Sequence, residues 1–443
     1  MTQKVLTVFI VSGLAISSAY AQQIEAPPRA SGITRGERPL DVQRNRQEVT
    51  VQANVLAGYD DDVSPDGSTA PVGPRPSGYT GAGSGRLRYF VGRDRKSLEV
   101  NTRGLVNSYD TIGTSYGGGV DAIGQTHIGR TDITTLQGIH SSPFFALGLF
   151  GALHDELGAE NPDTNPSNGI TESRMLSIDS IARVNRQWTR DFSTDVGFAF
   201  NKQTFSRGNS FDSRTNGASL GVQRAFDRDN SIRASYRYSD GVHTEATGRE
   251  LPETDQTIDL GWEHHRNVTR ARQVVISVGA GAVYVDTLNS ETRAPFTYWT
   301  PSGRGSLQYD LGGTWSVAGE YRRGLSVLNG VIPTSFISHT ASLRTGGRLG
   351  DRVETAYVLG YGNGQAGDND STSYDGYTGT AQVRVRLFSG LSWISNINRY
   401  QYQLSEGASA ILCVQRRLHR NAFWTGFTWS APLYRRYMRG STR

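Results

Sequence analysis

The chain has 443 residues, 36% of them hydrophobic, and its mean hydropathy is −0.46. Beyond the N-terminal segment it has no apolar stretch of about 18 residues, which excludes a membrane protein built of helices. The 46 basic and 41 acidic residues give a formal net charge of +5, and no basic run suggests a nucleic-acid partner.

The N-terminus has the pattern of an export signal. Lys4 precedes an apolar run over residues 5–16, which is too short to span a bilayer as a helix, and Ala19-Tyr20-Ala21 is a small-x-small cleavage site. We therefore predict a signal peptide over residues 1–21; an N-terminal membrane anchor is the alternative. Residues 22–46 lack apolar periodicity and contain Pro27-Pro28, which predicts a flexible periplasmic arm.

From about residue 47 to residue 430, segments of roughly ten residues alternate apolar and polar side chains. In the first, Val51 and Val55 share one face while Glu48 and Gln52 share the other, and Phe423 begins the apolar face of the last. We count about eighteen segments and predict an all-β fold, a transmembrane antiparallel up-and-down β-barrel of about 16–18 strands in the bacterial outer membrane. A large soluble sandwich or propeller is the alternative. Residues 431–443 are predicted to form a basic periplasmic tail.

The connections alternate between short and long, which predicts the orientation of the barrel. Short ones, predicted to be periplasmic, include residues 92–95, 129–131, 227–230, 311–313 and 388–390. Long ones, predicted to be extracellular, include residues 60–83, 154–170, 240–252 and 362–372. Outer-membrane barrels have short periplasmic turns and longer outer loops, and an even strand number leaves both termini in the periplasm.

Charged residues out of phase with the apolar face are the candidates for the lumen. A barrel of this size encloses a water-filled channel, and arginine can hydrogen-bond hydroxyl groups or pair with carboxylates. The alternative for each residue is an ion pair across the wall. The candidate pore-lining residues are Arg86, Arg88, Arg103, Arg233, Arg237, Glu320, Arg322, Glu354, Arg384 and Arg386, with Glu48, Glu99, Asp121, Asp195 and Asp259 as further acidic partners.

Catalytic and metal sites find little support. The eight histidines are scattered, and the adjacent pair His264-His265, which we expect at a periplasmic turn, cannot face one site on a strand. Asp60-Asp61-Asp62 could hold calcium weakly, but a solvated loop is the simpler interpretation. We predict a protein that is not an enzyme, with no catalytic residue, no metal and no cofactor.

Four short motifs resemble the β-barrel porin 2 family. Gly58-Tyr59-Asp60-Asp61-Asp62-Val63 is similar to its Gly-Tyr-Asp-Asp-Asn signature, with Asp62 in place of the usual Asn. Arg38-Pro39-Leu40-Asp41 and Leu153-His154-Asp155-Glu156 also resemble family segments, as does Gly324-Leu325-Ser326-Val327-Leu328. Members of that family often accompany exopolysaccharide systems, so the resemblance implies an outer-membrane conduit for a polysaccharide.

The sequence and the resemblance together favour a passive channel that exports a surface or secreted polysaccharide. The expected partners are outer-membrane lipid and lipopolysaccharide, the polysaccharide itself, and a periplasmic polysaccharide export protein. Two alternatives stay open: a general diffusion porin for small polar solutes, and a structural or adhesive outer-membrane barrel.

Overall fold

A computed structural model describes residues 46–61, 77–93, 95–109, 113–143, 174–206, 212–244, 248–269, 272–288, 294–312, 314–326, 336–366, 373–405 and 417–437. Within these ranges no helix is long and apolar enough to cross a membrane. The described residues form 18 strands: β1 (Arg46–Asp60), β2 (Gly78–Arg93), β3 (Lys96–Tyr109), β4 (Gly113–Ile128), β5 (Thr131–Pro143), β6 (Arg174–Gln187), β7 (Phe192–Phe205), β8 (Asp212–Ala225), β9 (Asn230–Thr244), β10 (Glu250–Thr269), β11 (Arg272–Leu288), β12 (Pro295–Leu311), β13 (Trp315–Ser326), β14 (Phe336–Leu349), β15 (Val353–Ala366), β16 (Ser373–Phe388), β17 (Leu391–Leu404) and β18 (Arg417–Tyr437).

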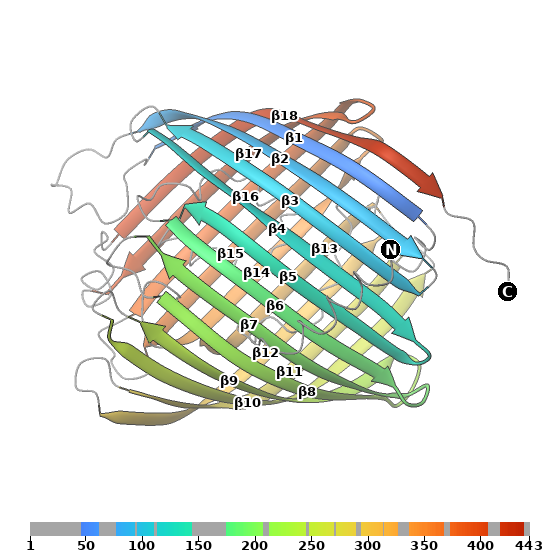
Figure 1. Ribbon diagram of the computed structural model, residues 1–443. Coiled ribbons are helices and arrows are strands. Elements are labelled where there is room, and N and C mark those ends of the chain that lie inside the picture. Colours follow the sequence, from blue (N-terminus) through green and yellow to red (C-terminus); the bar gives the residue numbers. More distant parts are fainter. Residues whose placement is uncertain are drawn as a thin grey trace, which may run out of the picture.

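The 18 strands of the described ranges form one closed antiparallel sheet. Each strand pairs with its neighbours in sequence, and β1 pairs with both β2 and β18, so the sheet has no free edge. The strands run obliquely around a common axis, and the start of β1 lies at the same rim as the end of β18 (Figure 1). This architecture confirms the predicted up-and-down barrel at the upper end of the predicted strand number.

The alternation in the sequence separates two surfaces of the barrel. On β1, Val55 is 68% exposed while the adjacent Asn54 is 4% exposed, and on β7 Phe198 is 50% exposed while Asn201 is 2% exposed. A strand points successive side chains to opposite faces, so the exposed apolar residues form the outer surface and the polar ones face inward. An apolar outside on a closed barrel is the surface that lipid requires, and the protein is therefore an outer-membrane β-barrel.

The predicted short turns that the structure describes in full lie at the rim that holds the start of β1 and the end of β18. The predicted turns at 129–131, 227–230 and 388–390 join β4 to β5, β8 to β9 and β16 to β17. Gly129 and Gly390 have positive φ angles of 63° and 82°, which a residue with a side chain rarely adopts. This rim is the periplasmic one, because outer-membrane barrels have their short turns on that side.

One predicted extracellular loop is much shorter than expected. Residues 240–252 read as a loop because Gly241, Gly248 and Pro252 interrupt the alternation. In the structure β9 continues to Thr244 and β10 begins at Glu250, with Pro252 opposite Val242 in the ladder. The predicted loops over 60–83 and 362–372 also overlap strands, because β2 begins at Gly78 and β15 ends at Ala366. The predicted loop at 154–170 lies outside the described residues.

The predicted boundary of the C-terminal tail is corrected by β18. This strand continues past residue 430 to Tyr437, which pairs with Arg46, so residues 431–437 belong to the barrel wall. The pairing shifts register between Val49 and Thr50, and Pro432 lies at this point. Both interrupt the alternation of apolar and polar residues, so the sequence pattern does not indicate that the strand continues. Arg46 likewise belongs to β1 rather than to the predicted arm, whose other residues lie outside the described ranges together with the signal peptide.

The motif that begins at Gly58 forms the seam between β1 and β18. Asp60 is 0% exposed and accepts two hydrogen bonds of 3.0 Å from Nε of Arg420, one at each carboxylate oxygen. The carboxylate of Asp61 accepts from the backbone N–H and from Nδ2 of Asn421, both at 2.6 Å. The solvated loop expected for this motif is therefore wrong for Asp60 and Asp61, whose carboxylates join the two terminal strands.

Candidate functional site: the inner wall of the barrel

All predicted lumen residues lie on the inward faces of their strands. Arg86 and Arg88 alternate with Leu87, which is 44% exposed on the outer surface, and Arg237 alternates with the outward Tyr236 and Tyr238. The same alternation places the rest on the inner face, namely Arg103, Arg233, Glu320, Arg322, Glu354, Arg384 and Arg386. Their register decides which of them meet.

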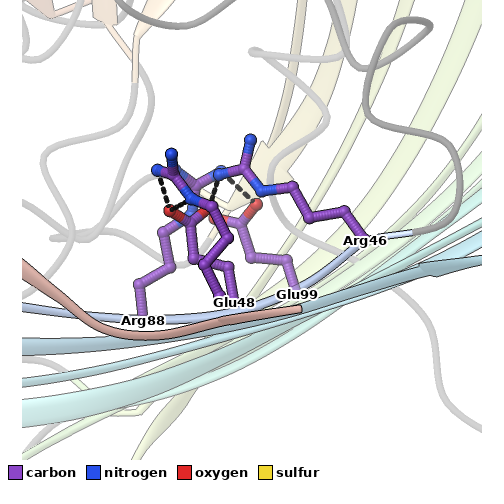
Figure 2. Close-up of polar contacts among 5 residues, drawn as sticks. Arg46, Glu48, Arg88 and Glu99 are labelled. Carbon is purple, nitrogen blue, oxygen red and sulfur yellow. Dashed lines mark hydrogen bonds and ion pairs between the residues drawn. The ribbon is translucent and has the colours of Figure 1, made fainter. Parts of the chain in front are cut away.

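The first group lies on β1, β2 and β3 near the periplasmic rim. The guanidinium of Arg88 donates to Oε2 of Glu99 at 2.7 Å, and Arg86 donates to Oδ1 of Asn101 at 3.2 Å. Glu48, which is 6% exposed, is paired with Arg46 of its own strand and accepts from Nε of Arg435 at 3.0 Å. Figure 2 shows Arg46, Glu48, Arg88 and Glu99 with their charged groups converging over the inner face of these strands.

A second group joins β3, β4 and β5 through a histidine. Arg103 NH2 lies 3.2 Å from Nδ1 of His140, and Nε2 of His140 lies 2.9 Å from Oδ1 of Asp121. The imidazole lies against Gly119, where an added Cβ would come within 2.2 Å of Nδ1. Sequence analysis did not single out His140. The glycines Gly119 and Gly138 leave room for its imidazole on the inner wall, and they are the sequence feature that could have indicated it.

In two further groups an acidic residue lies between two arginines. Asp195 on β7 is 3.3 Å from Arg183 on β6 and 3.8 Å from Arg233 on β9. Glu354 on β15 accepts from Nε of Arg348 at 3.1 Å and lies 3.8 Å from Arg384 on β16. The predicted residues of these groups are therefore paired, as the alternative interpretation required, and Arg183 and Arg348 are partners that sequence analysis missed.

A concentration of arginine lies on the wall formed by β9 to β13. Arg304 and Arg322 are directly opposite each other in the ladder between β12 and β13. The side chain of Arg304 extends along the wall over Gly279, where an added Cβ would lie 3.0 Å from its Nε. Arg237 is close enough to Arg322 to be repelled by it, and close enough to Asp255 and Asp259 to be attracted by them. Glu320 attracts Arg304.

Arg386 differs from the other predicted residues because it lies close to the periplasmic rim. It is exposed and pairs with Ser392 next to the turn between β16 and β17. Its place is therefore at the periplasmic mouth rather than within the wall.

The predicted position of His264-His265 at a turn is wrong. Both residues lie within β10, whose ladder with β11 continues to Thr269. His264 stacks on Trp262, with ring centroids 5.8 Å apart, while His265 lies beside Glu263, so the two rings face opposite sides as expected. Among the residues that the structure describes, no group of three or more potential ligand side chains gathers in a way that could hold a metal ion.

The wall therefore carries many charges, and several of them face a charge of the opposite sign. Arg88, Arg183 and Arg384 each have a carboxylate partner on a neighbouring strand. Such a surface offers hydrogen-bond donors and acceptors to a hydrated solute.

No protein-family model matches the chain, and no curated protein matches it in sequence. Among solved structures it is similar to Pseudomonas aeruginosa OpdQ, with 10% identity, coverage of 88% of this chain and 98% of that chain, and a TM-score of 0.45. It is also similar to Acinetobacter baumannii OccAB2, with 9% identity, coverage of 88% and 98%, and a TM-score of 0.46. Nothing about cargo follows from likenesses of this size, and the resemblance to the β-barrel porin 2 family stays a prediction.

Proposed function

We propose that the barrel is a passive outer-membrane channel for polar solutes and that its cargo is a polysaccharide leaving the cell. The observation that carries the proposal is the inner wall, on which guanidinium groups, carboxylates and amides alternate around the circumference. A barrel of eighteen strands is wide enough to enclose water. Hydroxyl-rich chains can exchange hydrogen bonds with such a wall step by step.

The pairing of the wall charges supports passage rather than retention. Conduction requires that a solute bind weakly enough to leave. Glu354 is already engaged by Arg348 and Arg384, and Asp195 by Arg183 and Arg233. A neutral or weakly charged glycan therefore meets no isolated charge at these positions.

A general diffusion porin for small polar solutes is the second candidate, and the same wall favours it equally well. The family resemblance is what favours the polysaccharide. However, the described part of its main motif, Gly58 to Asp61, takes part in closing the barrel. That motif therefore stabilises the fold rather than contributing to a binding site for cargo.

The test is a clean deletion strain in which polysaccharide is measured on the cell surface, in the medium and in the periplasm. Loss of surface and secreted polysaccharide, restored by the wild-type protein, supports export. The variant Arg384→Ala with Arg386→Ala should restore it poorly, because it removes two inward cations of β16. The matched control is Arg224→Ala, which removes an exposed outward cation of β8 and should restore export fully.

The same strain separates the two candidates. If polysaccharide output is unchanged while the uptake of small sugars falls, the channel is a diffusion porin. If neither changes and purified protein in planar bilayers gives no conductance, both proposals fail and the adhesive barrel becomes the better hypothesis.

A further inference from the structure

The outer surface of the barrel contains two cations in an unusual arrangement. Lys202 on β7 and Arg214 on β8 are directly opposite each other in the ladder between these strands. Both are exposed. Both point outward, because they alternate with Asn201 and Ser213, which are 2% and 3% exposed on the inner face. Like charges directly opposite each other on a sheet are destabilising unless something of opposite charge lies between them.

Within the described residues, no ion pair or side-chain hydrogen bond joins either cation to a carboxylate. The acidic residues on the outward face of β8 and β9, Asp212 and Asp240, form hydrogen bonds with other groups. Asp212 accepts a hydrogen bond from the backbone N–H of Phe205 at 2.9 Å, and Asp240 accepts one from Thr254 at 3.5 Å. Among the residues that the structure describes, no carboxylate is therefore in direct contact with Lys202 or Arg214.

The position of Lys202 and Arg214 along the barrel axis indicates which part of the lipid they face. The outward residues of β7 below Lys202 are mostly apolar and include Phe192, Val196 and Phe198, and those of β8 below Arg214 include Leu220 and Val222. Lys202 and Arg214 thus lie where the apolar band ends on the extracellular side, since both are near the ends of their strands away from the periplasmic turns. This is the level of the head groups of the outer leaflet.

A third outward cation near the extracellular rim lies apart from this pair. Arg174, at the start of β6, lies with its guanidinium 3.8 Å from the ring centroid of Tyr116, which is 58% exposed on the outer surface. It also donates to the backbone carbonyl of Tyr116 at 3.1 Å. The guanidinium of Arg174 therefore lies over β4, on the side of β6 that faces away from β7 and β8.

We propose that Lys202 and Arg214 bind a phosphate group of lipopolysaccharide in the outer leaflet. A phosphate offers several oxygen acceptors, so it can lie between the two cations and receive charge-assisted hydrogen bonds from both. The acyl chains of the same lipid would pack on the apolar residues below. This inference concerns the outer surface and does not depend on what passes through the lumen.

The test is binding of diphosphoryl lipid A to the purified full-length barrel in detergent, followed by native mass spectrometry over a titration. Basic residues near anionic lipid contribute about a factor of five each, so Lys202→Gln with Arg214→Gln should weaken binding roughly thirtyfold. Dephosphorylated lipid A should bind the wild type as weakly as diphosphoryl lipid A binds this variant. The exchange Lys202→Arg with Arg214→Lys keeps both charges and should retain binding.

The matched control is Arg186→Gln with Arg224→Gln, which removes two exposed outward cations from β6 and β8 at the periplasmic end of the same apolar band. This control should bind lipid A as the wild type does. Equal binding by the Lys202 and Arg214 variant, or tight binding of dephosphorylated lipid A, would overturn the proposal. Displacement of lipid A by inorganic phosphate at millimolar concentration would also overturn it, because the site would then recognise a free anion.

Discussion

The carboxylate of Asp60 and the guanidinium of Arg420 form a buried ion pair across the seam of the barrel, although 360 positions separate them in the chain. Asp60 is 0% exposed and Arg420 is 3% exposed. Two hydrogen bonds from Nε hold the arginine to both carboxylate oxygens at 3.0 Å. The first and last strands are thus joined by a contact that no other register of these two strands would make.

Replacing Asp60 by Ala should destabilise the barrel strongly. The change leaves the guanidinium of Arg420 buried without its carboxylate, which typically costs about 3–5 kcal/mol. Thermal unfolding in detergent, followed by the heat-dependent shift of the folded band on gels, measures the effect. The control is Asp132→Ala, because the pair between His127 and Asp132 is exposed and such pairs contribute about 0–1 kcal/mol. Equal melting temperatures for the two variants would contradict this account of the seam.

Replacing Gly58 by Ala should also weaken the seam, for a steric reason. A Cβ at Gly58 would lie 2.5 Å from the carbonyl oxygen of Phe423 and 2.7 Å from the ring of Trp424, which is 0% exposed. Overpacking of this kind costs about 1–3 kcal/mol. The control is Gly81→Ala on β2, where an added Cβ meets no atom within 4 Å. Denaturant unfolding of the two variants should separate them, and a loss of stability in the control alone would refute the argument.

Replacing Glu354 by Gln should make the channel more selective for anions. Glu354 is the acidic partner of both Arg348 and Arg384, so its neutralisation leaves two cations on the wall without their carboxylate. Reversal potentials of the purified protein in planar bilayers under a salt gradient measure the shift. Asp351→Asn, which changes an exposed residue at the turn between β14 and β15, should leave the selectivity unchanged.

The turn between β8 and β9 should show a pH-dependent contribution to stability. Hydrogen bonds from the Asn230 side chain, and then from the backbone N–H groups of Asp229 and Asn230, lower the pKa of Asp227 below its ordinary value of 3.8. A carboxyl group whose pKa is lower in the folded state stabilises that state above pH 3.8, and this contribution is lost as the pH falls through the folded pKa.

Wild type and Asp227→Ala should therefore differ in stability at neutral pH and converge as the pH falls below 3.8. Unfolding midpoints measured from pH 7 to pH 2.5 test this expectation. A difference that stays constant over the whole range would show that the hydrogen bonds to the charged carboxylate are not what stabilises the turn.

Sequence alone predicted the class of fold and the facing of the side chains well. Alternation is a local property, so Val55 and Asn54 could be assigned to opposite surfaces from the residues of β1 alone. Strand ends were predicted less well, because Pro432 and the adjacent register shift break the alternation while pairing with β1 continues. Gly241 and Pro252 led to the prediction of a loop in the same way, although both lie within the ladder of β9 and β10.

The contacts within the candidate site were harder to predict than its members. Arg384 and Glu354 were both assigned to the inner face, but their pairing depends on the register between β15 and β16. The Arg103, His140 and Asp121 group combines three strands, and the pair of Asp60 with Arg420 joins opposite ends of the chain. Periodicity contains no information about register, so such pairs require the structure.

The pairing of β1 with β18 also bears on how the barrel is made. Every other ladder joins strands that are neighbours in the chain, and these hairpins can form as the polypeptide arrives. The closing ladder has to wait for the final strand, and the offset at which it forms fixes the shear of the whole cylinder. Strand number and shear together set the diameter of a barrel. The contact between Asp60 and Arg420 stabilises the observed offset of this closing ladder, and with it the shear that goes with the diameter of the barrel.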